Sequence, residues 1–165
     1  MINANETKIS KDPSGKKLIV NRDFNAQPEK VWRAWTESNL LDAWWAPRPW
    51  KAVTKSMDFS EGGSWLYAMT GPAGEVHWCK VAYKTIAPKS SFSADNGFCD
   101  ENGNTSNAAP MMHWLVQFAA SGNGTAVTVD ITFDSEADLQ TIVDMGFKEG
   151  FSMGLANLDE LLAQS

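Results

Sequence analysis

The order of hydrophobic and polar residues predicts a strand followed by two short helices near the start of the chain. Residues 17–26 alternate between the two kinds, which is the period of a half-buried β-strand. Pro28 stands where a helix can begin, and apolar residues then recur at helical spacing as far as residue 37. A second short helical segment, residues 39–45, is ended by Pro47 and Pro49.

The middle of the chain predicts further strands, and its end predicts one long helix. The strand-like segments are residues 52–59, 64–70, 75–87, 91–98, 112–120 and 125–133, which brings the sheet to about seven strands. Short turn clusters separate most of them, so neighbouring strands are expected to form antiparallel hairpins. Ser135 followed by Asp138 is typical of a helix N-terminus, and this helix is expected to run to about Ala163.

Together these elements predict an α+β fold in which a curved antiparallel sheet wraps around the C-terminal helix. A long amphipathic helix must bury its apolar stripe, and one face of the sheet is the only large apolar surface that the pattern offers. We therefore expect a single domain over residues 17–165, preceded by a polar tail over residues 1–16. A sheet wrapped around a helix tends to leave a pocket between the two, which is a common kind of small-molecule site.

Composition and charge narrow the class of protein. The chain has 165 residues, of which 43% are hydrophobic and 21% are charged, enough apolar material for one core. Its 14 basic and 20 acidic residues give a net charge of −6, which disfavours a nucleic-acid partner. No apolar run is long enough to span a membrane and the first residues are polar, so we expect a cytoplasmic protein with no membrane partner.

Aromatic residues are unusually frequent, with eight tryptophans and eight phenylalanines. Every second residue of segments 64–70 and 112–120 is large and apolar for most of its length, too bulky for a solvated face. Such a lining favours a flat or apolar guest, although the same side chains can instead fill a core completely. The residues that we expect to line a ligand pocket are Trp65, Tyr67, Met69, Trp78, Trp114, Val116, Phe118, Gly150 and Phe151.

Gly146, Gly150 and Gly154 recur every four residues in the predicted C-terminal helix. A glycine in a helix costs about 1 kcal/mol relative to alanine, so something is expected to come close to the helix along this stripe. Either a neighbouring segment packs tightly against the bare backbone, or the missing side chains form the floor of a pocket. The regular spacing favours tight packing, and it predicts that replacing Gly150 by alanine destabilises the fold.

Arg22 is in register with the apolar residues of its strand, so alternation directs its guanidinium to the interior. A buried arginine is costly unless it is paired. We expect a structural ion pair with a carboxylate such as Glu61 or Glu149, and the alternative is that Arg22 is the polar anchor for an acidic ligand.

Residues suited to metal binding or catalysis are few and scattered. His77 and Cys79 share one face of a predicted strand. With His113 or Cys99 they are the nearest approach to a zinc site, but their spacing matches no zinc-binding motif. No pair of carboxylates suited to acid–base catalysis and no nucleophile, phosphate-binding or dinucleotide-binding motif is recognised. We therefore expect no metal, no cofactor and no catalytic residues.

Four segments of the chain resemble one protein family. They are VWRAWTE at 31–37, LDAWWAP at 41–47, DFSEGGSW at 58–65 and MGFKEGF at 145–151. In order and spacing they are similar to the activator-of-heat-shock-ATPase-like family of the START-like (SRPBCC) helix-grip superfamily. The resemblance implies a cavity fold without a shared reaction. A chaperone partner is not expected, because the chain has no room for the separate N-terminal domain of the eukaryotic co-chaperones.

Three functions remain open from the sequence. The first is noncatalytic binding of a small hydrophobic or aromatic ligand between the sheet and the C-terminal helix. The second is a protein–protein interaction module that binds a chaperone or a second copy of itself, either through an exposed edge or through residues 44–50. In that segment we expect Trp44 to be mostly buried and Trp50 partly exposed. The third is a cyclase- or hydrolase-like cavity enzyme, because START-like relatives include such enzymes.

Overall fold

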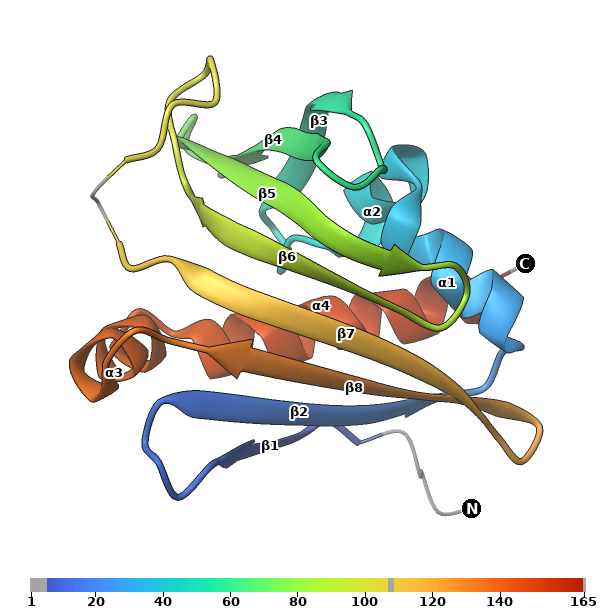
Figure 1. Ribbon diagram of the computed structural model, residues 1–165. Coiled ribbons are helices and arrows are strands. Elements are labelled where there is room, and N and C mark those ends of the chain that lie inside the picture. Colours follow the sequence, from blue (N-terminus) through green and yellow to red (C-terminus); the bar gives the residue numbers. More distant parts are fainter. Residues whose placement is uncertain (1–5, 107–108, 165) are drawn as a thin grey trace.

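A computed structural model describes residues 6–106 and 109–164, which form an antiparallel sheet packed against helices (Figure 1). The strands are β1 Lys8–Lys11, β2 Lys17–Phe24, β3 Lys51–Met57, β4 Ser64–Thr70, β5 Val76–Ala87, β6 Ser91–Phe98, β7 Met112–Ser121 and β8 Gly124–Thr132. The helices are α1 Pro28–Thr36, α2 Ser38–Trp44, α3 Glu136–Asp144 and α4 Phe147–Ala163. In space the strand order is β1-β2-β8-β7-β6-β5-β4-β3.

The helices cover one face of the sheet, and the hydrophobic core lies between the two layers. In Figure 1, α4 crosses behind the strands, α1 and α2 close one end, and α3 lies at the opposite end. The predicted α+β helix-grip fold is therefore confirmed. No helix in the described ranges is long and apolar enough to cross a membrane.

The sheet has eight strands rather than about seven, because part of the predicted polar tail belongs to it. Residues 8–11 form β1, which pairs antiparallel with β2 and places Ile9 opposite Val20. Ile9 packs against the core, whereas the other three residues of β1 are exposed. A four-residue strand with one apolar side chain gives too short an alternation to be recognised in the sequence.

The predicted single C-terminal helix is wrong, since the structure has two helices there. Its expected N-terminus is confirmed, because the backbone N–H of Asp138 donates to Ser135 Oγ at 3.1 Å. The first helix nevertheless ends at Asp144, and Gly146 has a φ of 90°. This left-handed conformation is readily adopted by glycine and cannot continue a right-handed helix. Gly146 is therefore a joint between α3 and α4 and not part of a helical stripe.

The two edges of the sheet differ from its centre. β1 and β3 each have only one neighbouring strand. β3 also carries an irregularity, because its register with β4 shifts between Thr54 and Ser56. Lys51 and Lys55 are exposed on this edge strand.

The helix α4 packs closely on the segment that follows α2. A methyl group on Gly154 would lie 3.0 Å from the backbone oxygen of Trp45. One turn further on, the amide Nδ2 of Asn157 donates to the backbone oxygens of Trp44 at 3.4 Å and Ala46 at 3.1 Å. Trp44 itself is 1% exposed, which confirms its expected burial. The tight-packing interpretation of the glycines thus applies at Gly154.

Gly150 differs from Gly154, and this difference gives a stability prediction. A methyl group on Gly150 would meet only Pro47 Cγ at 3.8 Å, an ordinary contact distance. We therefore expect Gly150→Ala to raise the free energy of unfolding by up to about 1 kcal/mol through helix propensity. This reverses the destabilisation that the sequence predicted.

The matched variant Gly154→Ala should destabilise the protein. Overpacking against a backbone oxygen costs about 1–3 kcal/mol, and this exceeds the gain in helix propensity. Urea denaturation of both variants measures the two changes. Equal effects in the same direction would contradict the assignment of close packing to Gly154 alone.

Candidate functional site

The interior of the molecule is built around the indole ring of Trp45. Trp45 directly follows α2, so the packing of α2 against α4 directs its side chain under the sheet. Its ring centroid lies 5.5 Å from that of Trp65 on β4 and 5.8 Å from that of Trp114 on β7. Phe151 of α4 is 6.2 Å away and Trp35 of α1 is 6.0 Å away. Aromatic rings from both layers therefore meet at one place.

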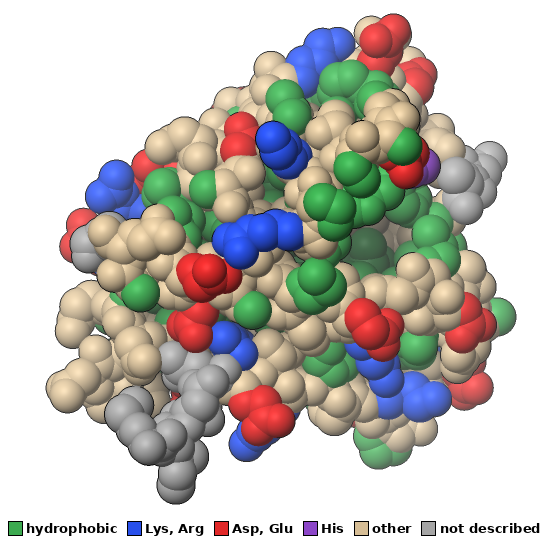
Figure 2. Space-filling view, turned by 180° about the vertical axis from the view of Figure 1, so that it is seen from behind, with side chains coloured by type: hydrophobic (Ala, Val, Ile, Leu, Met, Phe, Trp, Pro, Cys, Tyr) green, Lys and Arg blue, Asp and Glu red, His purple; other side chains and the backbone are tan. Residues whose placement is uncertain are grey.

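A small cavity of about 20 Å³ lies among these rings. Its lining residues are Trp35, Leu41, Trp45, Trp65, Val81, Tyr83, Phe92, Asn96 and Trp114. A cavity of this volume holds about one water molecule. Seen from the side of the helices, the molecular surface also has a hollow bordered by hydrophobic side chains (Figure 2).

Four of the residues expected to line a pocket lie at or next to this cavity. Trp65 and Trp114 line it directly. Tyr67 lies beside them, and its hydroxyl accepts a hydrogen bond of 2.8 Å from Trp45 Nε1. The ring of Phe151 is 5.2 Å from that of Trp114. These side chains thus surround the interior site from the sheet and from α4.

Four other expected residues are not among the cavity's lining residues. Val116 is fully buried in the core, and the ring of Phe118 packs 5.2 Å from that of Trp32 towards α1. Met69 is only half-buried at the border of the core. The backbone of Gly150 faces Pro47, so it does not form the floor of this cavity.

Trp78 lies on the opposite face of the sheet, which corrects its expected place in the pocket. Cys79 and Val81, at alternate positions of β5, belong to the core, and Trp78 belongs to the other face of this alternation. The ammonium group of Lys55 lies 5.6 Å from the centroid of the Trp78 ring on that face. Trp78 therefore contributes to the outer surface of the sheet.

Arg22 is buried as expected, and its partner is a carboxylate of α4. Its Nη2 donates to Asp159 Oδ2 at 3.0 Å, so the ion pair involves neither Glu61 nor Glu149. The Nη1 atom also donates to Thr7 Oγ1 at 3.3 Å. The guanidinium thus links β2 to α4 and does not line the cavity.

None of the four lining residues on β5 and β6 was predicted from the sequence. Val81 and Tyr83 occupy alternate inward positions of β5, and Phe92 and Asn96 occupy inward positions of β6. Strand alternation alone indicates that all four side chains point to the inner face of the sheet. Asn96 was missed because a polar residue at an inward position breaks the apolar pattern that marks a core face.

Three polar atoms of the cavity's lining residues have no hydrogen-bond partner among the described residues: Trp35 Nε1, Trp114 Nε1 and Asn96 Oδ1. Neighbouring indoles are satisfied, since Trp45 donates to Tyr67 and Trp65 Nε1 donates to Thr54 Oγ1 at 2.9 Å. A buried polar atom without a partner costs about 1–3 kcal/mol. The lining residues of this cavity therefore have hydrogen-bonding capacity that the described protein atoms do not use.

The ionisable groups beside the cavity stay neutral. Burial raises the pKa of the Cys79 thiol to about 12. Burial also raises the pKa values of the Tyr67 and Tyr83 hydroxyls well above their usual range. At neutral pH these groups are therefore protonated, and none of the three supplies an ionised nucleophile.

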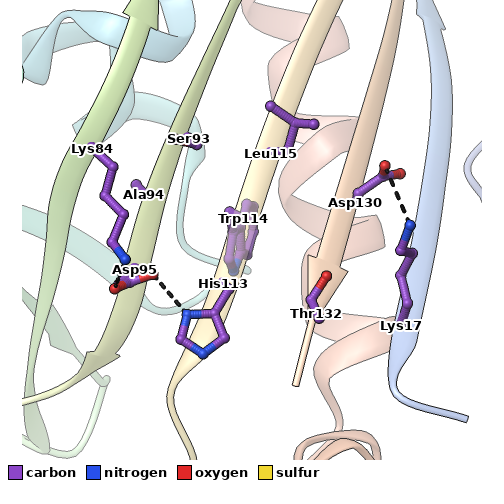
Figure 3. Close-up of a pocket in the computed structure, with 10 residues that line it drawn as sticks. All are labelled: Lys17, Lys84, Ser93, Ala94, Asp95, His113, Trp114, Leu115, Asp130 and Thr132. Atoms are coloured by element: carbon purple, nitrogen blue, oxygen red, sulfur yellow. Dashed lines mark hydrogen bonds and ion pairs between the residues drawn. The ribbon is translucent and has the colours of Figure 1, made fainter. Parts of the chain in front are cut away.

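A second, larger hollow of about 340 Å³ lies on the outer face of the sheet (Figure 3). In Figure 3 its charged side chains project from β2, β5, β6, β7 and β8. The ring of His113 lies between two carboxylates, with Nδ1 2.7 Å from Asp95 and Nε2 3.0 Å from Asp134. Lys84 Nζ lies 3.0 Å from Asp95 and Lys17 Nζ 3.9 Å from Asp130. The charges of this hollow are thus paired with one another.

The residues considered for a zinc site are not gathered in one place. His77 is exposed and its ring stacks on Trp50 with centroids 5.6 Å apart, whereas Cys79 is buried in the core. His113 lies on the outer face, in the hollow described above. Within residues 6–106 and 109–164, no group of three or more His, Cys, Asp or Glu side chains is arranged to hold a metal ion.

An antiparallel sheet that grips a helix over an aromatic interior defines a helix-grip protein. The chain belongs to the family described as Activator of Hsp90 ATPase homolog 1-like protein, whose model matches residues 25–163. A search of curated proteins finds no match.

Solved structures of bacterial proteins share this fold. Protein Ms6760 from Mycobacterium smegmatis is 29% identical, with a TM-score of 0.87 over 94% of this chain and 96% of that chain. A protein from Arthrobacter aurescens is also 29% identical, with a TM-score of 0.89 over 96% of this chain and 92% of that chain. The AHSA1 protein from Silicibacter pomeroyi, at 20% identity and a TM-score of 0.70 over 90% and 98% of the two chains, shares the fold.

The paired charges around His113 predict that stability depends on pH. The hydrogen bond to Asp95, and then that to Asp134, raises the pKa of His113 above its usual 6.5 despite partial burial. Burial alone would raise the pKa of Asp95, but the hydrogen bonds from His113 and Lys84 hold it below its usual value. Because the folded state binds the His113 proton more tightly, this stabilisation is complete below about pH 6.5 and is lost as the pH rises through the folded-state pKa.

Urea denaturation at about pH 5.5 and about pH 8.5 measures this effect. We expect His113→Gln to reduce the loss of stability between the two pH values. His77→Gln is the matched control, since the His77 ring stacks on Trp50, and it should leave that loss unchanged. An equal pH dependence in the wild type and in His113→Gln would contradict the assignment.

Proposed function

We propose that this protein binds a small apolar or aromatic molecule, without chemical conversion, in the interior between the sheet and α4. The observation that carries the proposal is the cavity whose lining residues contribute three unpartnered buried polar atoms. A ligand that reaches these atoms would supply the missing hydrogen bonds and bury its apolar part against aromatic rings. Mostly apolar walls with a few convergent polar groups are typical of small-molecule sites.

The volume of the cavity sets a condition on binding. At about 20 Å³ it is far smaller than the roughly 300 Å³ that a typical small-molecule pocket requires. The proposal therefore includes a rearrangement of the lining side chains when the ligand enters. Figure 2 shows a hollow between hydrophobic side chains on the helix side, and the proposal takes this hollow as the route of entry.

The alternative of a protein–protein module has less support. A binding surface formed by residues 44–50 requires exposed tryptophans in this segment. Trp44 is 1% exposed, and Trp45 lines the interior cavity. Trp50, partly exposed as expected, stacks on His77. The segment therefore contributes mainly to the packing of the molecule itself.

The proposal predicts that naphthalene changes the tryptophan fluorescence of the purified protein and raises its melting temperature. Trp35, Trp45, Trp65 and Trp114 all line the cavity, so a bound aromatic ring must contact at least some of them. Ligand binding stabilises the folded state by RT ln(1 + [L]/Kd), about 2.7 kcal/mol at 100 times Kd. If neither naphthalene nor a panel of larger apolar compounds produces either response, the proposal is overturned.

A pair of valine variants tests where the ligand binds. Val81 lines the cavity, so Val81→Ile should weaken naphthalene binding by about tenfold, since an overpacked methylene costs about 1–3 kcal/mol. Val116 lies in the core but does not line the cavity, and Val116→Ile is the matched control. Equal losses of affinity in the two variants would place binding outside this cavity.

A further inference from the structure

The cavity's three unpartnered polar atoms also restrict the chemistry of the ligand. Trp35, Trp114 and Asn96 are 2%, 5% and 7% exposed, so bulk water does not reach these side chains freely. All three line the same cavity although they come from α1, β7 and β6. The fourth unpartnered buried atom among the described residues, Arg22 Nε, belongs to a side chain that does not line it.

The hydrogen-bonding capacity of these three atoms is unequal. Each indole Nε1–H can only donate a hydrogen bond, whereas the oxygen Oδ1 of Asn96 can only accept one. The group that satisfies all three must therefore accept two hydrogen bonds and donate one. A hydroxyl group has this capacity, with two lone pairs and one O–H.

Carbonyl, ether and charged groups each lack one of these capacities or carry a charge. A neutral carboxamide or carboxyl group has both capacities but spreads them over two atoms, whereas a volume of about 20 Å³ holds about one water-sized group. A carbonyl, an ether or a carboxylate has no hydrogen to donate to Asn96, and an ammonium group has no lone pair to accept from the two indoles. The lining residues include no Asp, Glu, Lys or Arg, so an ionised ligand would be buried without a counter-charge.

We infer that the natural ligand is a neutral phenol or alcohol whose hydroxyl group is bound by Trp35, Trp114 and Asn96. This inference rests on the proposed function. The remainder of such a ligand is apolar, since the other lining residues are aromatic or aliphatic. A single water molecule matches the same three atoms and the volume of about 20 Å³, so water is the competing occupant in the absence of ligand.

The test compares two probes of similar shape, 2-naphthol and 2-methylnaphthalene, by tryptophan fluorescence titration. We expect 2-naphthol to bind at least about tenfold more tightly, because a site built around a hydroxyl discriminates strongly against an analogue that lacks it. Equal affinities would overturn the hydroxyl inference and leave the proposed function standing. If neither probe nor naphthalene binds, the proposed function itself fails.

Two variants connect this preference to the named atoms. Asn96→Leu removes the acceptor at similar volume, and Trp114→Phe removes one N–H but keeps an aromatic ring. Each should lower the affinity for 2-naphthol by about tenfold and change that for 2-methylnaphthalene by less than about twofold. Retention of the full preference for 2-naphthol in both variants would overturn the inference.

Asn157 provides the matched control for the change of asparagine to leucine. It is also 7% exposed, but its amide donates to the backbone of Trp44 and Ala46. Asn157→Leu should therefore lower the melting temperature and leave the preference for 2-naphthol intact. Asn96→Leu should instead abolish this preference, because it removes the acceptor for the hydroxyl of the ligand. A lower melting temperature for Asn96→Leu together with equal binding of the two probes by the wild type would assign the cavity to a structural water and overturn the inference.

Discussion

The close approach of α4 to the backbone at Trp44 and Trp45 is the contact on which the interior depends. A Cβ at position 154 would lie 3.0 Å from the Trp45 carbonyl oxygen, which is tighter than an ordinary contact, so a glycine fits best here. The amide of Asn157 then satisfies the backbone oxygens of Trp44 and Ala46, which the end of α2 leaves without a helical partner. This contact holds α2, the segment after it and α4 together. The indole of Trp45 therefore lies beneath the sheet.

With Trp45 in this position, aromatic rings fill most of the interior, but some of their polar atoms have no hydrogen-bond partner. The rings around Trp45 pack mostly edge to face, which is a favourable arrangement for aromatic pairs. Close packing of rigid rings leaves little freedom to turn each polar edge towards a partner. Trp45 and Trp65 reach hydroxyl groups, whereas Trp35 and Trp114 do not. The same packing density that stabilises the core therefore leaves polar atoms without partners among the residues that line this cavity.

The sequence predicted the elements better than it predicted the site. Alternation and helical spacing located the strands from β2 to β8 and both short helices, because each buries a regular face. The break at Gly146 was missed because glycines at 146, 150 and 154 recur every four residues like a stripe, and only its φ distinguishes Gly146. At the site, Trp65 and Trp114 were predicted from strand alternation. Trp35 and Trp45 were not, because which helical residues meet across a cavity depends on how α1 and α2 dock, and spacing within one segment carries no such information.

The two edge strands of the sheet affect how readily one molecule pairs with another. A long, flat edge strand offers free N–H and C=O groups to a strand of another molecule. Here β1 is only four residues long and includes two lysines, while β3 combines exposed lysines with a register shift that interrupts its ladder. Short length, charge and bulges are the features by which proteins protect open edges from aggregation. Both edges of the described sheet are thus poorly suited to pairing with a strand of another molecule.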